Sequence, residues 1–479
     1  FFSFFLILVM SVLLTSELFS FLGRPATFDA YVHISSIAQF SKIVGEGEIP
    51  VVWMNSFANY GIPIGLFTHQ LTNYLGALIV LIIHDPVVSY NLLIFIAVFL
   101  SNILGYIFLR FYFSSLASFL GIFIFSFTPY RILNIYIRGA MPEVFSGIYL
   151  PLILIAMYLL VVKKKIYALF LLTLFIAGLT LTHPMMLVVY SFLFIPYLFF
   201  LLLISNLSNM SRMKILAISH AFMLLGVLIC SYFVIPLNLE IKYFYFIFEK
   251  NHLKPYSFLS LSNFLSSQWH YFTDKEIFTR GQVVLFGLIE TIILISGFLY
   301  VLYKKVFKKS KENTEILYLV LIVAAGAIFF TTKYSAIFFQ GIFFLNSIQF
   351  PWRFLSVMIF VPPIVVAFLY DKFPNKIIFL ILIITASCFS FPQIYGKNFS
   401  VSSIQSYFFT QGNPHSILMN TVWTGKSEDY PDKVKQGEII EGDGRIVRES
   451  LKNSRRSYQV NAKTPLKMVD RTFYFPGWN

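Results

Sequence analysis

Apolar runs near the length of a transmembrane helix, about twenty residues, recur along the first 395 positions of this chain. A helix of that length crosses the hydrocarbon core of a bilayer, which is roughly 30 Å thick. Hydrophobic residues make up 58% of the 479 residues and charged residues only 12%, whereas soluble proteins have roughly 45–50% and about 25%. This composition excludes an ordinary soluble enzyme and a disordered chain. We therefore predict an all-α polytopic membrane protein.

About eleven runs are predicted to span the membrane, with boundaries good to a few residues. They are 1–22, 86–109, 113–128, 144–162, 166–182, 184–204, 215–236, 282–303, 315–331, 352–370 and 376–395. One more apolar segment, 62–83, is interrupted by Pro63, His69, Gln70, Thr72 and Asn73. Whether this segment crosses the membrane is decided by charge.

Basic residues cluster between the predicted spans, and with eleven spans every cluster falls on one side. The clusters are Arg110, 163–165, Arg212 with Lys214, 304–311 and Lys372 with Lys376. Positive loops mark the cytoplasmic side, so the loops at 23–85, 129–143, 237–281 and 332–351 and the tail are predicted outside. A spanning 62–83 would move the first loop inside although that loop has no positive excess, so we predict a non-spanning juxtamembrane helix there. The same bias explains the net charge of +14 without nucleic acid.

The composition changes sharply after the last predicted span. Residues 1–395 are predicted to form the transmembrane domain, and 396–479 an exposed, mostly β domain with strands near 437–440, 445–449, 457–460 and 472–475. The chain starts inside an apolar run and stops just after a predicted strand, so we interpret it as a fragment at both ends. The two cysteines, Cys230 and Cys388, lie in apolar runs and are expected to be inert core thiols.

The first predicted outer loop carries a carboxylate close to the end of a span. Asp29 and His33 are four residues apart and would share one face of a helix. At the membrane surface Asp29 could meet both a lipid-borne substrate and water. Alternatively, Asp29 caps the following helix and His33 is simply solvated.

The second predicted outer loop holds Tyr130, Arg131, Arg138, Gly139 and Glu143 in an otherwise uncharged stretch. Arginine offers a fixed fork of donors that suits phosphate oxygens, and glycine allows close backbone approach. A phosphate-binding loop and an interfacial anchor with an internal arginine–glutamate pair are both compatible with this pattern.

Other candidates are weaker. His183 separates two predicted spans, and it could carry a proton, bind a ligand or only shape the turn. Arg353, after Pro351 and Trp352, fits an interface anchor and could also attract a lipid phosphate. The sequence contains no P-loop, dinucleotide-binding, CxxC, HExxH or GxSxG motif, so ATP-driven transport, dinucleotide redox chemistry and zinc proteolysis lack support.

Several strings, taken in order, resemble one family. They are DAYVH (29–33), WMN to NYGIP (53–63), PYR (129–131), RGAMPE (138–143), TH (182–183), QFPWR (349–353) and FPGW (475–478). The chain resembles the bacterial and archaeal membrane proteins called 6-pyruvoyl-tetrahydropterin-synthase-related, which are also similar to YfhO-like proteins. Nothing in it is similar to a pterin enzyme. That family is similar to the GT-C superfamily of membrane glycosyltransferases.

The resemblance implies a GT-C layout, in which a sugar moves from a polyprenyl-phosphate or polyprenyl-diphosphate donor to an acceptor on the outer face. It implies that Asp29 is the general base, that Arg138, with Arg131, holds the lipid phosphate, and that Glu143 orients Arg138 or acts as a second acid. Tyr130, His33 and His183 are the further substrate-binding candidates. Many superfamily members carry a paired acid where this chain has Ala30, so we assign no cofactor and no metal, although a divalent ion is possible.

The leading hypothesis is therefore a multi-pass glycosyltransferase of the cell membrane that transfers a hexose or pentose. Its expected partners are a polyprenyl-linked sugar, a glycan, lipid or protein acceptor, and membrane lipids. The alternatives are a non-catalytic binder or flippase of polyprenyl-linked glycans, and a scaffold in envelope assembly. Flipping needs a continuous polar path, whereas charge inside the spans is sparse, which favours transfer.

Overall fold

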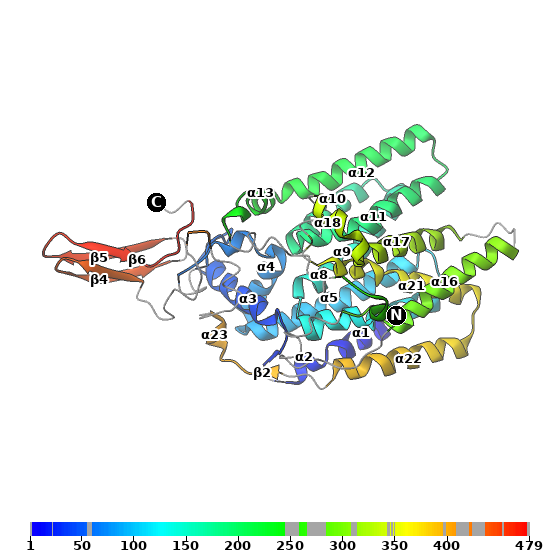
Figure 1. The fold of residues 1–479 in the computed structure, drawn as a ribbon, viewed down its shortest axis with the longest axis horizontal. Helices are drawn as coiled ribbons and strands as arrows, with labels where there is room; N and C mark the ends of the chain where they lie inside the picture. The colour runs from blue at the N-terminus through cyan, green and yellow to red at the C-terminus, as the bar shows by residue number, and fades with distance from the viewer. Residues whose placement is uncertain are drawn as a thin grey trace. The chain divides into compact units, whose positions relative to one another are not determined.

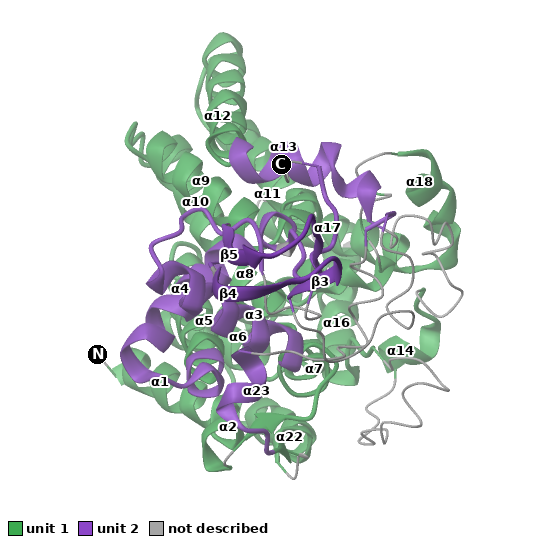
Figure 2. Cartoon of the chain, turned by 90° about the vertical axis from the view of Figure 1, so that its left-hand side faces the viewer, with its two compact units in different colours: residues 1–30, 91–230, 251–400 green, residues 31–90, 231–250, 401–479 purple. Residues whose placement is uncertain are grey.

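A computed structural model of the chain describes residues 2–21, 23–54, 60–244, 258–265, 284–307, 314–342, 345, 348, 350–395, 399–408, 421–423, 436–452 and 455–476. Asn55, Asn59, Gln349, Gly477 and Trp478, which contribute to the strings above, lie outside these described residues. The protein is mostly helical (Figure 1). It divides into unit 1, residues 1–30, 91–230 and 251–400, and unit 2, residues 31–90, 231–250 and 401–479 (Figure 2).

Unit 1 is a helical assembly. Its longer helices are α1 (Phe2–Thr15), α5 (Pro86–Leu109, which begins in unit 2), α6 (Ser115–Ser126), α9 (Tyr149–Val161), α10 (Ala168–Thr182), α11 (Pro184–Ile204), α12 (Asn209–Ile229), α16 (Leu288–Phe307), α17 (Glu315–Thr331), α21 (Val361–Lys372) and α22 (Lys376–Ile394). Short elements include α2 (Glu17–Ser20), α7 (Pro129–Leu133), α8 (Met141–Ser146), α14 (Leu261–Leu265), α18 (Ala336–Gly341), the 3₁₀-helix η7 (Pro351–Phe354) and α20 (Leu355–Met358). Strands β1 (Arg24–Pro25) and β2 (Phe399–Ser400) pair antiparallel.

The predicted count of eleven spans is not confirmed. Among the described residues, 6 helical segments are long and apolar enough to cross a membrane, or up to 8 if each of two bent pairs is one span. One bent pair joins α6 to Pro129–Arg138 at 45°, where Pro129 starts a new helix and cannot continue the old one. The predicted spans at 1–22 and 166–182 contain α1 and α10, with 14 and 15 residues. The predicted non-spanning segment contains α4 (Gln70–Ile83), also of 14 residues, so length alone does not separate these three.

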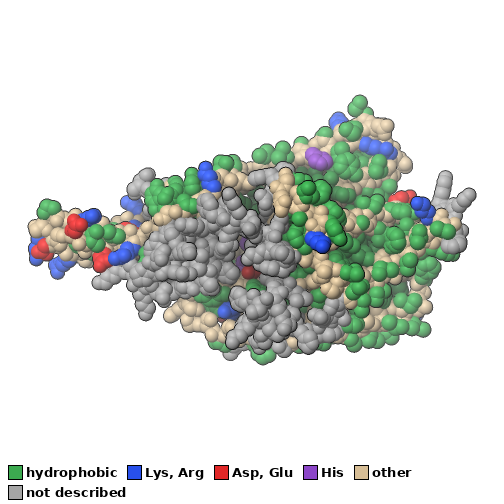
Figure 3. All heavy atoms as spheres, viewed as in Figure 1, with side chains coloured by type: hydrophobic (Ala, Val, Ile, Leu, Met, Phe, Trp, Pro, Cys, Tyr) green, Lys and Arg blue, Asp and Glu red, His purple; other side chains and the backbone are tan. Residues whose placement is uncertain are grey.

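The helices expose large apolar side chains. Leu224 and Leu228 on α12, Ile292 and Ile295 on α16, and Ile377 on α22 are each at least half exposed. Figure 3 shows apolar side chains spread over the helices on one face, whereas Lys, Arg, Asp and Glu gather over the strands of the C-terminal segment. In water so much apolar surface would be unfavourable, so it fits contact with lipid.

Unit 2 combines α3 (Ala30–Gly45), α4, α13 (Ser231–Leu239) and α23 (Ile404–Phe408) with four strands. The strands are β3 (Gly437–Glu441), β4 (Gly444–Leu451), β5 (Arg456–Ala462) and β6 (Lys467–Asp470). β3 pairs with β6 and β4 with β5, both antiparallel.

The prediction of a strand at 472–475 is wrong. The ring of Phe473 stacks on Tyr60, with centroids 4.7 Å apart, and Phe475 packs with Trp53 and Phe244. Phe473 and Phe475 are buried because both rings enter apolar clusters, not because they belong to a sheet. The fourth strand lies just before them, as β6.

Candidate functional site

The second predicted outer loop folds into two short helices joined at a glycine. Pro129 opens α7, which runs into a single turn of π-helix, η2 (Asn134–Arg138). Gly139 ends it at a φ of 65°, and its N–H donates to the carbonyl of Asn134. α8 then starts at Met141 with Glu143 in its first turn. π-turns are frequent at functional sites, and this one places Arg138 and Glu143 on either side of the same bend.

Glu143 is the centre of a buried polar cluster, which we call the Glu143 cluster. Its side chain is 2% exposed, and its two oxygens accept hydrogen bonds from four groups and form an ion pair with a fifth. Oε1 accepts from the Tyr130 hydroxyl at 2.6 Å, Ser356 at 3.2 Å and Asn134 at 3.3 Å, and Oε2 is paired with Arg138 Nη1 at 2.8 Å and Arg353 Nε at 3.5 Å. A buried carboxylate persists only when it is paired and hydrogen-bonded in this way.

Arg353 is the member of this cluster that sequence reasoning classed as an interface anchor. It lies in η7, at the start of the segment Pro351–Lys372, and its Nη1 lies 3.4 Å from the sulfur of Met185 on α11. Its neighbour Trp352 lies under the Arg138 guanidinium, 4.6 Å from ring centroid to Cζ. The signal that could have identified Arg353 was the QFPWR string itself. That string points to a site only when Glu143, 210 positions away by the numbering, is known to be its partner.

Asp29 is attached to this cluster through the backbone. Its N–H donates to the Arg138 carbonyl at 2.8 Å, and the N–H of Phe28 donates to Ile137 at 3.2 Å. The Asp29 carboxylate interacts electrostatically with the guanidinium groups of both Arg138 and Arg353. The fold therefore brings together two predicted residues that are about 110 positions apart by their numbering.

Gly139 makes this attachment possible. A Cβ built on it would lie 2.2 Å from Oγ1 of Thr27 and 2.9 Å from the backbone nitrogen of Ala30. The positive φ and the missing side chain are therefore both required, which agrees with the close backbone approach expected from the sequence.

Arg131 points elsewhere. Its guanidinium donates to Asn102 at 2.8 Å, Ser101 at 2.6 Å and the carbonyl of Val98 at 3.2 Å, all on α5. Its Cζ also lies 4.1 Å from the centre of the Phe125 ring. This arrangement joins α7 to α5 and α6.

The two candidate histidines fall in different units. His183 is buried between α10 and α11, where its N–H donates to Leu179 at 2.8 Å and its carbonyl accepts from Met186 at 2.9 Å. His33 belongs to unit 2, and its ring lies 5.9 Å from that of His69.

The arginines of the cluster keep donors that an anion can use. Their two guanidinium groups face two carboxylates, those of Glu143 and Asp29, so the four charges balance. Nη1 of Arg138 is held by Asn134 at 2.6 Å and by Glu143, and within the described residues no acceptor is found for its Nη2. A guanidinium that is held in place in this way can bind phosphate oxygens through its remaining donors. In the part of the chain that the structure describes, no group of three or more His, Cys, Asp or Glu could hold a metal ion.

Comparison with known proteins gives three findings. A sequence model described as "6-pyruvoyl-tetrahydropterin synthase related domain; membrane protein" matches residues 69–396. No curated protein matches the chain. Two crystal structures of the oligosaccharyltransferase of Archaeoglobus fulgidus are similar to this chain at 14% identity. The apo form has a TM-score of 0.47, and the match covers 86% of this chain and 56% of that one. The complex with zinc and sulfate has a TM-score of 0.45, and the match covers 83% of this chain and 54% of that one. The chain thus spans about half the length of those structures.

Proposed function

The chain belongs to the 6-pyruvoyl-tetrahydropterin synthase related family of membrane proteins, and we propose that it is a GT-C-type glycosyltransferase. The donor is a sugar on a polyprenyl phosphate or diphosphate, and the acceptor is a hydroxyl at the outer face of the cell membrane. The observation that carries this proposal is the attachment of Asp29 to Arg138, beside a second buried arginine, Arg353. A base next to two phosphate-binding cations is what transfer from a lipid phosphate requires.

In this proposal Asp29 is the general base. Its carboxylate takes the proton of the acceptor hydroxyl while that oxygen forms a bond to the anomeric carbon. The bond from the anomeric carbon to the donor phosphate oxygen breaks, and its electron pair stays on the phosphate. The products are the glycosylated acceptor, the free polyprenyl (di)phosphate and a proton on Asp29.

Arg138 and Arg353 stabilise the charge that develops on the leaving phosphate. Glu143 accepts hydrogen bonds from four groups, forms an ion pair with Arg353 and is 2% exposed, so we assign it to orienting the two arginines rather than to proton transfer. Donors fixed in advance contribute most to transition-state stabilisation because they need no reorganisation. Tyr130 and Asn134 fix Glu143 in turn.

The remaining candidates receive supporting roles. We assign Arg131 to holding α7 on α5, because its guanidinium donates to three groups there. His33 and His183 stay candidates for acceptor or donor contacts. A divalent metal is not part of the proposed mechanism.

The decisive experiment measures sugar transfer by the full-length protein, purified in lipid and supplied with radiolabelled polyprenyl-phosphate sugars. Asp29→Asn keeps the shape of the side chain and removes its basicity. We expect turnover to fall by about 10²–10⁴-fold, the usual contribution of a general base, with donor binding retained. The matched control is Glu46→Gln, which removes an exposed carboxylate near the end of α3; its turnover should stay within about twofold.

Each result separates the alternatives. Equal turnover in wild type and Asp29→Asn would keep an enzyme but reject this base. Binding of the donor without turnover across a panel of acceptors, with transfer of labelled lipid between leaflets of a vesicle, would favour a flippase instead.

A further inference from the structure

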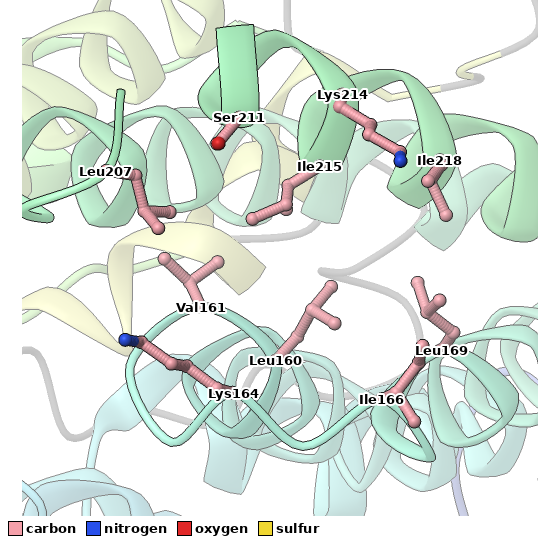
Figure 4. Close-up of a pocket in the computed structure, with 10 residues that line it drawn as sticks. All are labelled: Leu160, Val161, Lys164, Ile166, Leu169, Leu207, Ser211, Lys214, Ile215 and Ile218. Atoms are coloured by element: carbon pink, nitrogen blue, oxygen red, sulfur yellow. The ribbon is translucent and has the colours of Figure 1, made fainter. Parts of the chain in front are cut away.

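A cavity lies at the end of unit 1 where α9 and α11 finish and α10 and α12 begin. Its volume is about 360 Å³. The wall is aliphatic, with Leu160 and Val161 from α9, Leu169 from α10 and Ile215 and Ile218 from α12 (Figure 4). Since these helix ends flank the basic loops of the sequence, the cavity lies at the membrane surface that we predict to be cytoplasmic.

The cavity exists because α10 and α12 are in close contact near Gly226 and diverge about one turn nearer the membrane surface. A Cβ on Gly226 of α12 would lie 2.6 Å from the carbonyl of Thr173 on α10, and the Thr173 hydroxyl donates to the carbonyl of Phe222 at 2.9 Å. About one turn nearer the surface, Leu169 and Ile218 line open space instead. The gap is therefore built into the helix pair.

Two lysines complete the lining from opposite walls. Lys164 comes from the turn after α9 and Lys214 from α12 (Figure 4). Both are exposed, and among the described residues neither forms an ion pair. Lysines in this position can lay their apolar stems along the wall and keep their ammonium groups at the surface.

The backbone of Lys164 adopts a conformation that is strained for a lysine. Its φ is 53°, in the left-handed region that glycine and asparagine adopt more readily than lysine. The N–H of Lys165 donates to the carbonyl of Leu159 at 2.9 Å, which fixes the turn. A lysine therefore occupies a position where another residue would be less strained.

We propose that this cavity binds an anionic phospholipid, with an acyl chain against the aliphatic wall and the headgroup at the cavity rim, which carries Lys164 and Lys214. The charge fits, because two exposed lysines flank an apolar wall at the membrane surface, and the cytoplasmic leaflet carries the anionic lipids. The size also fits. An acyl chain is narrow and apolar, and it can enter a cavity of about 360 Å³ lined by aliphatic side chains.

The test is native mass spectrometry of the delipidated full chain, titrated with phosphatidylglycerol or with phosphatidylcholine of the same acyl chains. Wild type should bind phosphatidylglycerol more tightly. Lys164→Asn combined with Lys214→Gln should weaken that binding by about 30-fold, since each basic residue near a membrane surface contributes about 1 kcal/mol, and should leave phosphatidylcholine unchanged. Lys164→Asn also relieves the backbone, so the melting temperature of the lipid-free protein should not fall.

The matched control is Lys163→Asn with Lys165→Gln, which also removes two positive charges, both from the turn that holds Lys164 and both outside the cavity lining. An equal loss in both double variants would overturn the proposal, because it would show a general charge effect. Ile218→Trp fills the cavity without a change in charge and should also weaken phosphatidylglycerol binding; binding that is unaffected would overturn it as well. Glycerol phosphate should not compete, and competition at equal concentration would assign the site to a free phosphate ester instead.

Discussion

Two carboxylates of this protein have nearly the same kinds of partner and very different surroundings. Each is bound by a tyrosine, a side-chain amide, a hydroxyl and an arginine. For Glu143 these are Tyr130, Asn134, Ser356 and Arg138, with Arg353 in addition; for Asp470 they are Tyr458, Gln436, Thr472 and Arg456. The side chain is 2% exposed at Glu143 and 28% exposed at Asp470.

The comparison shows that the same kinds of hydrogen bond contribute differently to stability in a buried site and in a solvent-exposed site. Around Glu143, water cannot replace a lost partner, so each charge depends on the others. Around Asp470, water replaces a lost partner and screens the remaining charges. The first arrangement is suited to holding the two arginines rigidly, as the proposed transfer requires, and the second to stabilising a small solvent-exposed sheet.

The largest effect is expected at the buried carboxylate. Glu143→Gln removes the buried carboxylate that pairs with Arg138 and Arg353, and it should destabilise the protein by about 3–5 kcal/mol. Chemical unfolding in mixed micelles measures this loss. Adding Arg353→Met to Glu143→Gln should recover part of it, because one uncompensated cation is removed.

The control for this prediction is Glu46→Gln on the exposed end of α3, which should change stability by no more than about 0.5 kcal/mol. Similar losses at Glu143 and Glu46 would contradict the assignment of Glu143 to a mutually dependent cluster.

An intermediate effect is expected where the first loop is attached to this cluster. Gly139→Ala places a Cβ against Thr27 and forces alanine to a φ of 65°, which should cost about 2–4 kcal/mol and displace Asp29. Gly326→Ala in α17 meets nothing within 4 Å and should be neutral or stabilising by up to about 1 kcal/mol. The melting temperatures of the two variants, measured in the same detergent, test this prediction. An unchanged melting temperature for Gly139→Ala would show that Asp29 is only loosely attached to the Glu143 cluster.

The smallest effect is expected at Asp470, and it depends on pH. Burial raises the pKa of Asp470, but hydrogen bonds from Thr472, Tyr458 and Gln436 and the charge of Arg456 outweigh it, so the pKa lies below its ordinary value. A lowered folded-state pKa gives stability above the unfolded-state value of about 4, and this stability is lost as the pH falls through the folded pKa. Asp470→Asn should therefore lower the free energy of unfolding of the sheet by about 1 kcal/mol or less at pH 7. At a pH where the carboxyl of the wild type is protonated, the substitution should have no effect.

Hydrogen exchange of the backbone amides in β3 and β6 provides the local readout for this prediction. Protection in wild type should fall toward that of Asp470→Asn as the pH falls below about 4. A difference between the two proteins that stays constant with pH would show that the carboxylate charge is not involved.

Much of the fold could be predicted from local sequence. The polytopic helical character follows from run length and hydropathy, and three of the four strands were placed within a few residues of β3, β4 and β5. The number of spans could not be fixed, because bends such as the one at Pro129 divide an apolar run without changing its composition. The false strand at 472–475 has a similar cause, since alternating buried aromatic residues do not reveal what they pack against.

The candidate site was predicted only as separate pieces. Asp29, Arg138 and Glu143 were singled out because charged residues are rare in this chain, and the structure places them together. Arg131 and Arg138 could not be distinguished in sequence, yet one donates to α5 and the other pairs with Glu143. Arg353 was undervalued because a helix-start arginine after proline and tryptophan is also what an interface anchor looks like.

By itself the sequence determined that this protein lies in a membrane, and that its few charged residues outside the basic loops are candidates for function. Only the tertiary structure decided which arginines share Glu143, and that Asp29 is tied to Arg138 through the backbone. Hydropathy and periodicity are local properties, and a helix follows from them. A buried charge requires a partner, but which of several distant residues becomes that partner is settled only when the helices pack.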